Sequence, residues 1–356
     1  MPNQLLAQRK LYTKIVFTLK KLLIVIFLAG LVAAAGAYYL IFGPNVRTDK
    51  AVVTVAPGTT VPQLSRMLEP YVRFPEGVSM TARLKKFRRP KAGKYLLRKG
   101  MSSNDLINMF RSGRQVPVTL TFNNTATPEQ LAGKVARVIN ADSASILRAM
   151  LDPDFLARHG FTRDNAILMY IPNTYKFHYF TSPEQFRERM WKEYRKFWNE
   201  SRKNKARRLG LTPLETGILA SIVQKETNVA SEKGTVARVY LNRLRRGMKL
   251  QADPTVVFAY HKTTGDTTVI KRVLNKHLAV DSPYNTYKYP GLPPGPIAMP
   301  DISTIDAVLN APRHDYLYFS ADPKRPGHHL FAKNLSQHLK NARQYHRHLN
   351  RRKIYK

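Results

Sequence analysis

A single glutamate, Glu226, stands among apolar residues in the stretch "LASIVQKETNVA" and is the side chain best suited to acid–base chemistry. Thr212-Pro213-Leu214-Glu215 is a capping box with proline at the first helical position, so it predicts a helix from Pro213. Advancing about 100° per residue places Glu226 in the middle of the apolar arc of this helix and points Gln224 away from it. A carboxyl group that loses hydration has a raised pKa, so Glu226 can hold a proton near neutral pH and deliver it to a leaving group.

Two other interpretations of Glu226 remain open from periodicity alone. The helix could end before Glu226 and leave its carboxylate in water, because helix boundaries deduced from sequence are uncertain by about 2–4 residues. Alternatively, Arg238 or Arg243 of the next segment, "EKGTVARVYLNRLRRG", could pair with it. Gly247 ends that segment, and we expect it to be a second helix that folds back on the first. Its inward positions are Val236, Val239, Tyr240 and Leu244.

Two later segments combine polar, aromatic and rigid residues, as a sugar-binding cleft requires. They are "LQADPTVVF" and "DSPYNTYKYPGLPPGPI". Tyrosine rings stack on pyranose faces, while Asn, Thr and Gln side chains supply directional hydrogen bonds. Composition alone supports equally well the alternative that these segments are proline-rich connections on the surface.

The composition of the chain limits the other kinds of reactive or binding site that it can contain. The chain of 356 residues has no cysteine, so disulfides and thiolate metal sites are excluded. The formal net charge of +36 attracts nucleic acid, anionic lipid or carboxylate-bearing polymers, but no nucleic-acid-binding motif is present. We expect neither a metal nor a cofactor: the chain has no HExxH zinc motif. It also has no G-x-S-x-G elbow that would hold a serine nucleophile. His328 and His329 are adjacent, and the remaining tail histidines fall in a basic helix that we expect to be solvated: His338, His346 and His348.

An uncharged run, Leu22–Phe42, is long enough to cross a bilayer as a helix. Several lysines and arginines and no acidic residue precede it, so we expect residues 1–21 in the cytoplasm and everything after the run outside. The alternative is a cleaved signal peptide. Its apolar core is usually shorter, about 7–15 residues, and here apolar residues continue after the small-residue stretch "AAAGA".

The exported part reads as an α+β protein in two domains. Residues 43–118 predict a small mixed α/β module of two short helices on two or three strands, with a helix that begins after Ser102 and stops at Gly113. Residues 119–356 predict a larger mixed domain with helices beginning after Thr127 and Ser182. Loops and prolines follow Gly247, and a basic helix ends the domain.

From about Thr119 to the last helix, the chain resembles the endolytic murein transglycosylases of the MltG/YceG-like family. The motifs that carry the resemblance occur in order: "SIVQKET", "YLNRL", "LQADPTV", "SPYNTY", "GLPPGPI" and "YLYFSAD…GHHLFAKN". The resemblance implies a protein anchored in the inner membrane with a LysM-like module at 43–118 and a YceG-like catalytic domain at 119–356. It also implies cleavage of peptidoglycan glycan strands from within, leaving 1,6-anhydro-muramic ends and terminating strand elongation, with peptidoglycan synthases as further partners.

Carried over by residue, the resemblance makes Glu226 the catalytic acid and base. Many members of the family have Glu at Gln224 and Asp at Asn173; the first departure leaves Glu226 as the sole candidate. The substrate-binding residues that we expect are Gln251, Asp253, Thr255, Tyr284, Asn285, Thr286, Tyr287, Asn173 and Tyr175.

Two rival functions remain open. A lysozyme-like hydrolase pairs two carboxyl groups, and Asp253 and Asp281 are the available partners for Glu226. A non-catalytic anchored receptor for peptidoglycan or DNA would use the positive charge and bind without breaking bonds. The motif-bearing stretch is not especially basic, which counts against the receptor, and we expect no nucleic-acid partner.

Overall fold

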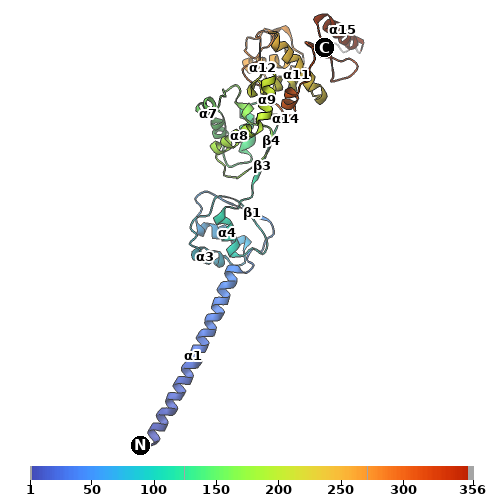
Figure 1. Ribbon diagram of the computed structural model, residues 1–356. Coiled ribbons are helices and arrows are strands. Elements are labelled where there is room, and N and C mark those ends of the chain that lie inside the picture. Colours follow the sequence, from blue (N-terminus) through green and yellow to red (C-terminus); the bar gives the residue numbers. More distant parts are fainter. Residues whose placement is uncertain (1, 124, 271, 352–356) are drawn as a thin grey trace. The chain divides into compact units, whose positions relative to one another are not determined.

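The computed structural model describes residues 2–123, 125–270 and 272–351 as a mixed helix and strand protein whose sheets are two-stranded. The chain divides into two compact units. The first contains the residues up to Val118 together with His178–Phe180 (Figure 1). The second contains Thr119–Phe177 and the residues from Thr181 onward.

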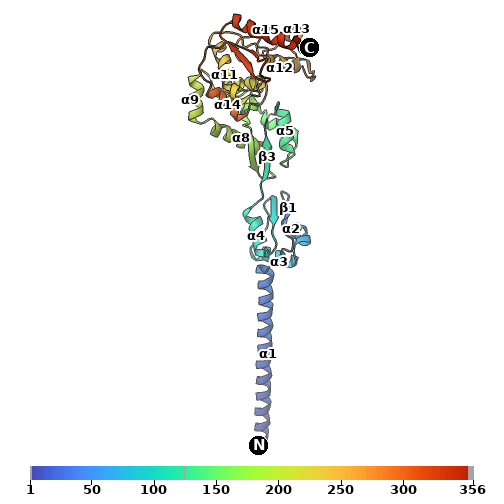
Figure 2. The same cartoon turned by 90° about the vertical axis from the view of Figure 1, so that its right-hand side faces the viewer.

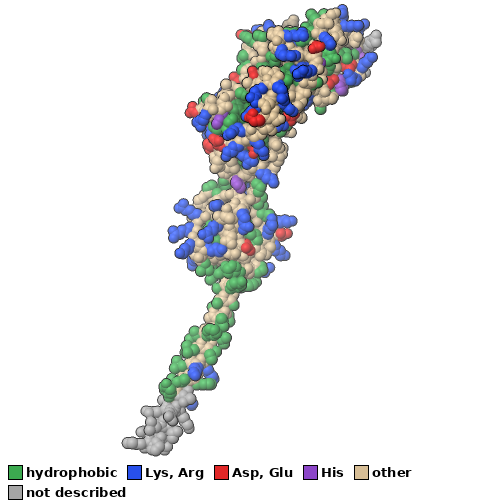
Figure 3. Space-filling model, viewed as in Figure 1, with side chains coloured by type: hydrophobic (Ala, Val, Ile, Leu, Met, Phe, Trp, Pro, Cys, Tyr) green, Lys and Arg blue, Asp and Glu red, His purple; other side chains and the backbone are tan. Residues whose placement is uncertain are grey.

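Helix α1 (Pro2–Phe42) opens the first unit. Its Lys14–Phe42 part is long and apolar enough to cross a membrane, and none of its most apolar stretch is buried. Figure 3 shows hydrophobic side chains along the described part of this helix and basic side chains toward its N-terminal end. The helix extends further toward the N-terminus than the predicted span Leu22–Phe42, because the basic residues before that run are helical too. It is compatible with a single-pass membrane anchor.

The rest of the first unit packs helices against one antiparallel sheet. Strand β1 (Ala51–Val55) pairs with β2 (Gly93–Leu97), with Val53 opposite Tyr95. The helical segments are α2 (Val61–Leu68), a 3₁₀ turn (Glu69–Tyr71), α3 (Pro75–Leu84) and α4 (Ser103–Ser112). The fully buried side chains of this core include Val55, Leu64, Leu68, Tyr95, Leu97, Leu106, Ile107 and Phe110.

The sequence predicted two of these helices and missed α3. Ser102 and Asp105 form the predicted capping box at α4, and Gly113, with φ of 76°, ends that helix as expected. Helix α3 follows Phe74, whose side chain makes no capping hydrogen bond, so Pro75 and the acidic Glu76 in its first turn are the local signals of its start.

The second unit is mostly helical (Figure 2). Its two small sheets pair β3 with β4 and β5 with β6. The strands are β3 (Val118–Phe122), β4 (Asn173–Phe177), β5 (Tyr318–Ala321) and β6 (His329–Ala332). The helices are α5 (Pro128–Ala136), α6 (Ser143–Met150), α7 (Pro153–Arg158), a 3₁₀ turn (Ala166–Met169), α8 (Pro183–Phe197), α9 (Glu200–Arg208), α10 (Pro213–Glu226), α11 (Ala230–Arg245), α12 (Asp253–Thr264), α13 (Asn275–Leu278), α14 (Ile302–Leu309) and α15 (Leu335–Arg351).

The predicted helix starts of this unit are confirmed where a side chain caps the helix. Thr127, Ser182 and Thr212 each accept a backbone N–H from three residues further on, at the starts of α5, α8 and α10. Helix α12 was missed, because its "ADPTVVF" stretch looked like loop. Its N-cap is Ala252, which has no side-chain acceptor, so only the proline in its first turn marks the start.

Helix α10 lies at the centre of the second unit. Every residue from Thr216 to Val223 is buried, because α11, α12 and α14 all pack against this helix. The predicted one-sided apolar arc was therefore too narrow, and Ala220 and Ser221, outside that arc, are buried as well. Helices α11 and α14 also pack on each other and lie side by side in both ribbon views (Figures 1 and 2).

Candidate active site

Helix α10 extends to Glu226, which is its last residue. The predicted fold-back is confirmed: α11 packs against α10, and Val236, Val239 and Tyr240 are buried, whereas Leu244 is only partly buried. Tyr240 is 1% exposed and donates a hydrogen bond from its hydroxyl to Glu226 Oε1 at 2.6 Å. The carboxyl group of Glu226 is thus held by a tyrosine of the neighbouring helix.

The environment of Glu226 favours its protonated form. The pKa of Glu226 is raised from an ordinary value of 4.5 to about 7, mainly by burial and to a smaller extent by the charge of Asp253. The hydrogen bond from Tyr240 and the positive charge of Arg243 lower this pKa and only partly offset the burial. The side chain is half-buried by area, but the surrounding protein excludes most of the water around the carboxyl group.

The two arginines that could have neutralised Glu226 have other partners. Arg238 donates to the backbone carbonyls of Pro312 and Ala311 at 2.9 and 2.7 Å. Arg243 donates to the carbonyls of Leu317 and Leu250, both at 2.6 Å. Within the residues that the structure describes, neither forms an ion pair with Glu226. Arg238 instead holds the segment between α14 and β5, and Arg243 holds that segment and the one that follows α11.

Gln224, expected to point away from the apolar arc, forms hydrogen bonds to the loop before α14. Its Nε2 donates to Met299 O at 3.2 Å and its Oε1 accepts from Asp301 N at 2.6 Å. Its role in the fold is to attach that loop to α10.

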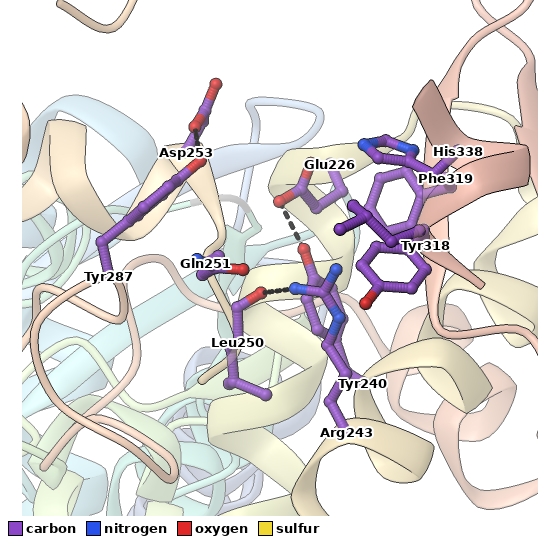
Figure 4. Close-up of a pocket in the computed structure, with 11 residues that line it drawn as sticks. Glu226, Tyr240, Arg243, Leu250, Gln251, Asp253, Tyr287, Tyr318, Phe319 and His338 are labelled. Atoms are coloured by element: carbon purple, nitrogen blue, oxygen red, sulfur yellow. Dashed lines mark hydrogen bonds between the residues drawn. The ribbon is translucent and has the colours of Figure 1, made fainter. Parts of the chain in front are cut away.

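Glu226 lines a pocket of about 320 Å³. The other lining residues are Tyr240, Arg243, Leu250, Gln251, Asp253, Tyr287, Tyr318, Phe319, Leu335 and His338. Figure 4 shows Asp253 and Tyr287 on one side of Glu226, and the rings from β5 and α15 on the other. A carboxyl group with a raised pKa therefore faces a cavity with carboxylate, amide and aromatic walls, which suits a saccharide.

The segment before α12 is fastened to the loop after Ser282 by buried hydrogen bonds. Gln251 N donates to Thr286 O at 3.1 Å, and Ala252 N donates to Thr286 Oγ1 at 3.0 Å. The hydroxyls of Thr255 and Thr286 lie 2.7 Å apart. Gln251 has φ of 50°, a left-handed conformation that is uncommon outside glycine, and this places it in the pocket wall.

Asp253 and Tyr287 come from these two segments and bind each other in the pocket. Tyr287 donates its hydroxyl hydrogen to Asp253 Oδ1 at 2.5 Å. Asn285 is fully buried, donates to Leu278 O and Val280 O, and accepts the N–H of Tyr287 on its Oδ1.

The structure thus divides the expected substrate-binding residues into three groups. Gln251, Asp253 and Tyr287 lie in the pocket with Glu226, whereas Thr255, Asn285 and Thr286 are buried behind its wall. The remaining three lie elsewhere, and they are Tyr284, Asn173 and Tyr175.

Tyr284 lines a separate cavity of about 570 Å³ and donates its hydroxyl hydrogen to Asp164 at 3.1 Å. Asn173 is an exposed residue at the start of β4, and its Oδ1 accepts the backbone N–H of Thr174. Tyr175 of the same strand is buried and donates to Ile171 O at 2.7 Å. These contacts are internal to the fold.

Sequence reasoning missed several residues of the pocket. Tyr240 was placed inward by helical periodicity, but its partner could not be deduced. His338 was expected in a solvated helix; that expectation was wrong, because its half-buried ring lines the pocket from α15. His328 and His329 both donate from Nδ1 to Glu232, at 3.0 and 2.8 Å, and connect the β5–β6 hairpin to α11. In the described residues no three His, Asp or Glu side chains converge as a metal site.

Comparisons with known proteins agree on one family. The model of the YceG-like family matches residues 53–344. A Bacillus subtilis (strain 168) protein named endolytic murein transglycosylase is 32% identical over 270 residues, which are 71% of this chain and 72% of that protein. A protein of the same name from Streptococcus pneumoniae (strain R6) is 28% identical over 324 residues, which are 82% of this chain and 58% of the relative.

A solved structure has a similar fold. It is the crystal structure of a putative YceG-like protein from Listeria monocytogenes, with 28% sequence identity and a TM-score of 0.54. The similarity covers 82% of this chain and 98% of the Listeria chain.

Proposed function

Because this chain belongs to the YceG-like family, we propose that it is an endolytic murein transglycosylase, a lyase that cuts peptidoglycan glycan strands and leaves 1,6-anhydro-muramic ends. Relatives that carry this name support the assignment. The observation that carries it is Glu226, a carboxyl group whose pKa is raised to about 7 and which faces a saccharide-sized pocket. An acid of this kind is present in both protonation states near neutral pH.

Glu226 then acts twice in the proposed reaction. Its protonated form donates to the glycosidic oxygen between N-acetylmuramic acid and N-acetylglucosamine, and the bond from that oxygen to the muramic C1 breaks. The ionised carboxylate next takes the proton of the muramic C6 hydroxyl, whose oxygen forms a bond to C1. The nucleophile belongs to the substrate, and the effective molarity of such a group reaches about 10⁵ M or more, so no second carboxylate is needed to activate water.

The residues around Glu226 have distinct proposed roles. Tyr240 orients the carboxyl group through its hydrogen bond. Gln251, Asp253 and Tyr287 contact the glycan in the pocket. The buried residues Thr255, Asn285 and Thr286 hold those contacts in place rather than touching substrate.

The location of the enzyme follows from α1. We propose that α1 anchors the chain in the cytoplasmic membrane, with the N-terminus in the cytoplasm, so that the residues after α1 lie outside and reach newly made glycan. We also propose that residues 43–118, in which helices pack on the β1–β2 sheet around a compact core, are a LysM-like module. Peptidoglycan synthases are the proposed source of the strand.

The hydrolytic alternative has one observation in its favour, because Asp253 provides a second carboxylate in the same pocket. Its oxygen already accepts a hydrogen bond from Tyr287. Asp281, the other candidate, is not among the residues that line this pocket; it accepts a hydrogen bond from Tyr289 at 2.7 Å.

Digestion of purified sacculi with the full-length protein in detergent tests the proposal. Mass spectrometry separates the two chemistries, because a hydrolysed product is heavier than an anhydro product by one water molecule. Glu226→Gln is expected to lower the rate of anhydro-product formation by about 10²- to 10⁴-fold. Asp281→Asn is the matched control and is expected to leave the rate unchanged. Anhydro products formed at the wild-type rate by Glu226→Gln would refute the assignment.

A further inference from the structure

The first turn of α15 forms one wall of the pocket. Asn334 caps this helix, since its Oδ1 accepts Gln337 N at 2.9 Å and its carbonyl accepts His338 N at 3.1 Å. The helix packs on β5 and β6, and this packing directs Leu335 and His338 to the pocket. Figure 4 shows the imidazole ring of His338 on the side of Glu226 that lies away from Asp253 and Tyr287.

The ring of His338 packs with one face against a tyrosine, and one of its nitrogens lacks a hydrogen-bond partner among the described residues. It stacks on the ring of Tyr318, with 5.2 Å between ring centroids and 22° between the planes. Within the described part of the chain, its buried Nδ1 has no hydrogen-bond partner. Burial lowers the pKa of His338 below its ordinary value of 6.5, and the charge of Arg243 lowers it further, so the imidazole is neutral at neutral pH.

The position of the proton follows from the surroundings of the ring. A neutral imidazole has one N–H donor and one acceptor nitrogen. A proton on Nδ1 would be a buried donor without an acceptor, which costs more than an acceptor nitrogen left unpaired. We therefore assign the proton to Nε2. The charged and titratable groups that line the pocket with this ring are Glu226 and the side chains of Tyr240, Arg243, Asp253, Tyr287 and Tyr318.

We propose that His338 is a substrate-contacting residue, which donates a hydrogen bond from Nε2 to a carbonyl oxygen of an N-acetylated sugar bound beside Glu226. This inference rests on the proposed function. A donor-only group is best matched by an acceptor-only group, and the amide carbonyl is the strong acceptor of an N-acetylhexosamine that cannot also donate. The stacked Tyr318 fixes the ring, so the donor is already oriented before the sugar binds.

Two substitutions at His338 test the donor. His338→Phe keeps a ring on Tyr318 and removes the hydrogen bond, whereas His338→Gln places an amide donor at about the position of Nε2. His348→Phe is the matched control, because His348 lies in the same helix but does not line the pocket. For cleavage of sacculi by the full-length chain, His338→Phe is expected to lower kcat/KM about tenfold. His338→Gln is expected to stay within about threefold of wild type, and His348→Phe is expected to match it.

A binding measurement separates this inference from the proposed function. A chito-oligosaccharide is titrated into full-length Glu226→Gln protein with and without His338→Phe, and the expected result is about tenfold weaker binding without the imidazole. If the wild type cleaves no sacculi but this tenfold loss is seen, the proposed function fails and the contact stands.

Three results would overturn the contact. One is equal oligosaccharide binding with and without His338→Phe, and another is equal cleavage by His338→Phe and wild type. The third is an equal loss in His338→Gln and His338→Phe, with unchanged thermal unfolding, because a lost donor alone would be restored by the amide. In each case cleavage by the wild type would leave the proposed function intact.

Discussion

Replacing Tyr240 by phenylalanine tests how the pocket sets the protonation of Glu226. The change removes one hydroxyl that donates to Glu226 Oε1 at 2.6 Å and keeps the buried ring. A hydrogen bond to a charged group contributes about 1.5–3 kcal/mol, and we take about 1.4 kcal/mol of it as specific to the ionised carboxylate. That difference corresponds to about one pKa unit. The pKa of Glu226, about 7 in the wild type, is therefore expected to rise to about 8.

The assay is the pH dependence of kcat/KM for cleavage of sacculi by the full-length chain. Glu226 must be protonated to donate to the leaving group, so the rate falls as pH rises through its pKa. At pH 8 about a tenth of the wild-type carboxyl groups are protonated, against about half in Tyr240→Phe. The alkaline limb of the profile is expected to move up by about one pH unit, while the maximal rate falls because the carboxyl group is less well oriented.

The control is Tyr318→Phe, which also removes a hydroxyl from the pocket wall but none that bonds to Glu226. Its profile is expected to keep the wild-type limb. A limb in Tyr240→Phe that stays in place or moves to lower pH would refute the reasoning, since the hydroxyl would then not favour the ionised form.

Further predictions concern stability. The pKa of Glu226 is higher in the fold than its ordinary value of 4.5, so the wild type loses stability as pH rises from about 4.5 through about 7. In urea titrations across pH, Glu226→Gln is therefore expected to match the wild type below pH 4.5 and to exceed it by up to about 3 kcal/mol above pH 7; no gain at high pH would contradict this. Thr286→Val leaves Ala252 N without its acceptor and is expected to cost about 1–3 kcal/mol in the same titration and to raise KM. An unchanged free energy of unfolding and an unchanged KM would mean that the Thr286 hydroxyl does not hold the pocket wall in place. Burial alone would raise the pKa of Glu232, but hydrogen bonds from His329 and its neighbour outweigh it and leave the pKa lowered. Glu232→Gln is expected to lower the melting temperature at neutral pH. The difference in melting temperature between the variant and the wild type is expected to vanish as pH falls through that lowered pKa. A difference that stays constant with pH would contradict stabilisation by the ionised carboxylate of Glu232.

The sequence predicted some of the helices that begin with a local capping signal, but it missed α6, α7 and α9, which Asp142, Asp152 and Asn199 cap. Helices with a Ser or Thr cap begin where expected, at Ser102, Thr127, Ser182 and Thr212. Helices α3 and α12 follow residues without a capping side chain, so a proline in the first turn is the main local signal of each start, and tertiary packing supplies most of their stability.

In the candidate site too, local patterns predicted some residues but not the contacts between them. Helical periodicity placed Glu226 on a buried face, and composition pointed to the segments that contain Gln251 and Asp253. The partners depend on contacts between residues far apart in sequence, which no local pattern encodes. The hydrogen bond from Tyr240 to Glu226 and the place of His338 in the same pocket as Glu226 are of this kind.

The wall that α15 contributes has a consequence for the timing of activity. A chain is synthesised from its N-terminus, so Glu226 and Tyr240 exist in the growing polypeptide well before Leu335 and His338 do. A chain that ends before α15 would contain Glu226 but would lack the part of the pocket wall that Leu335 and His338 form. The pocket is therefore complete only after α15, the last helix to be synthesised, has packed on β5 and β6.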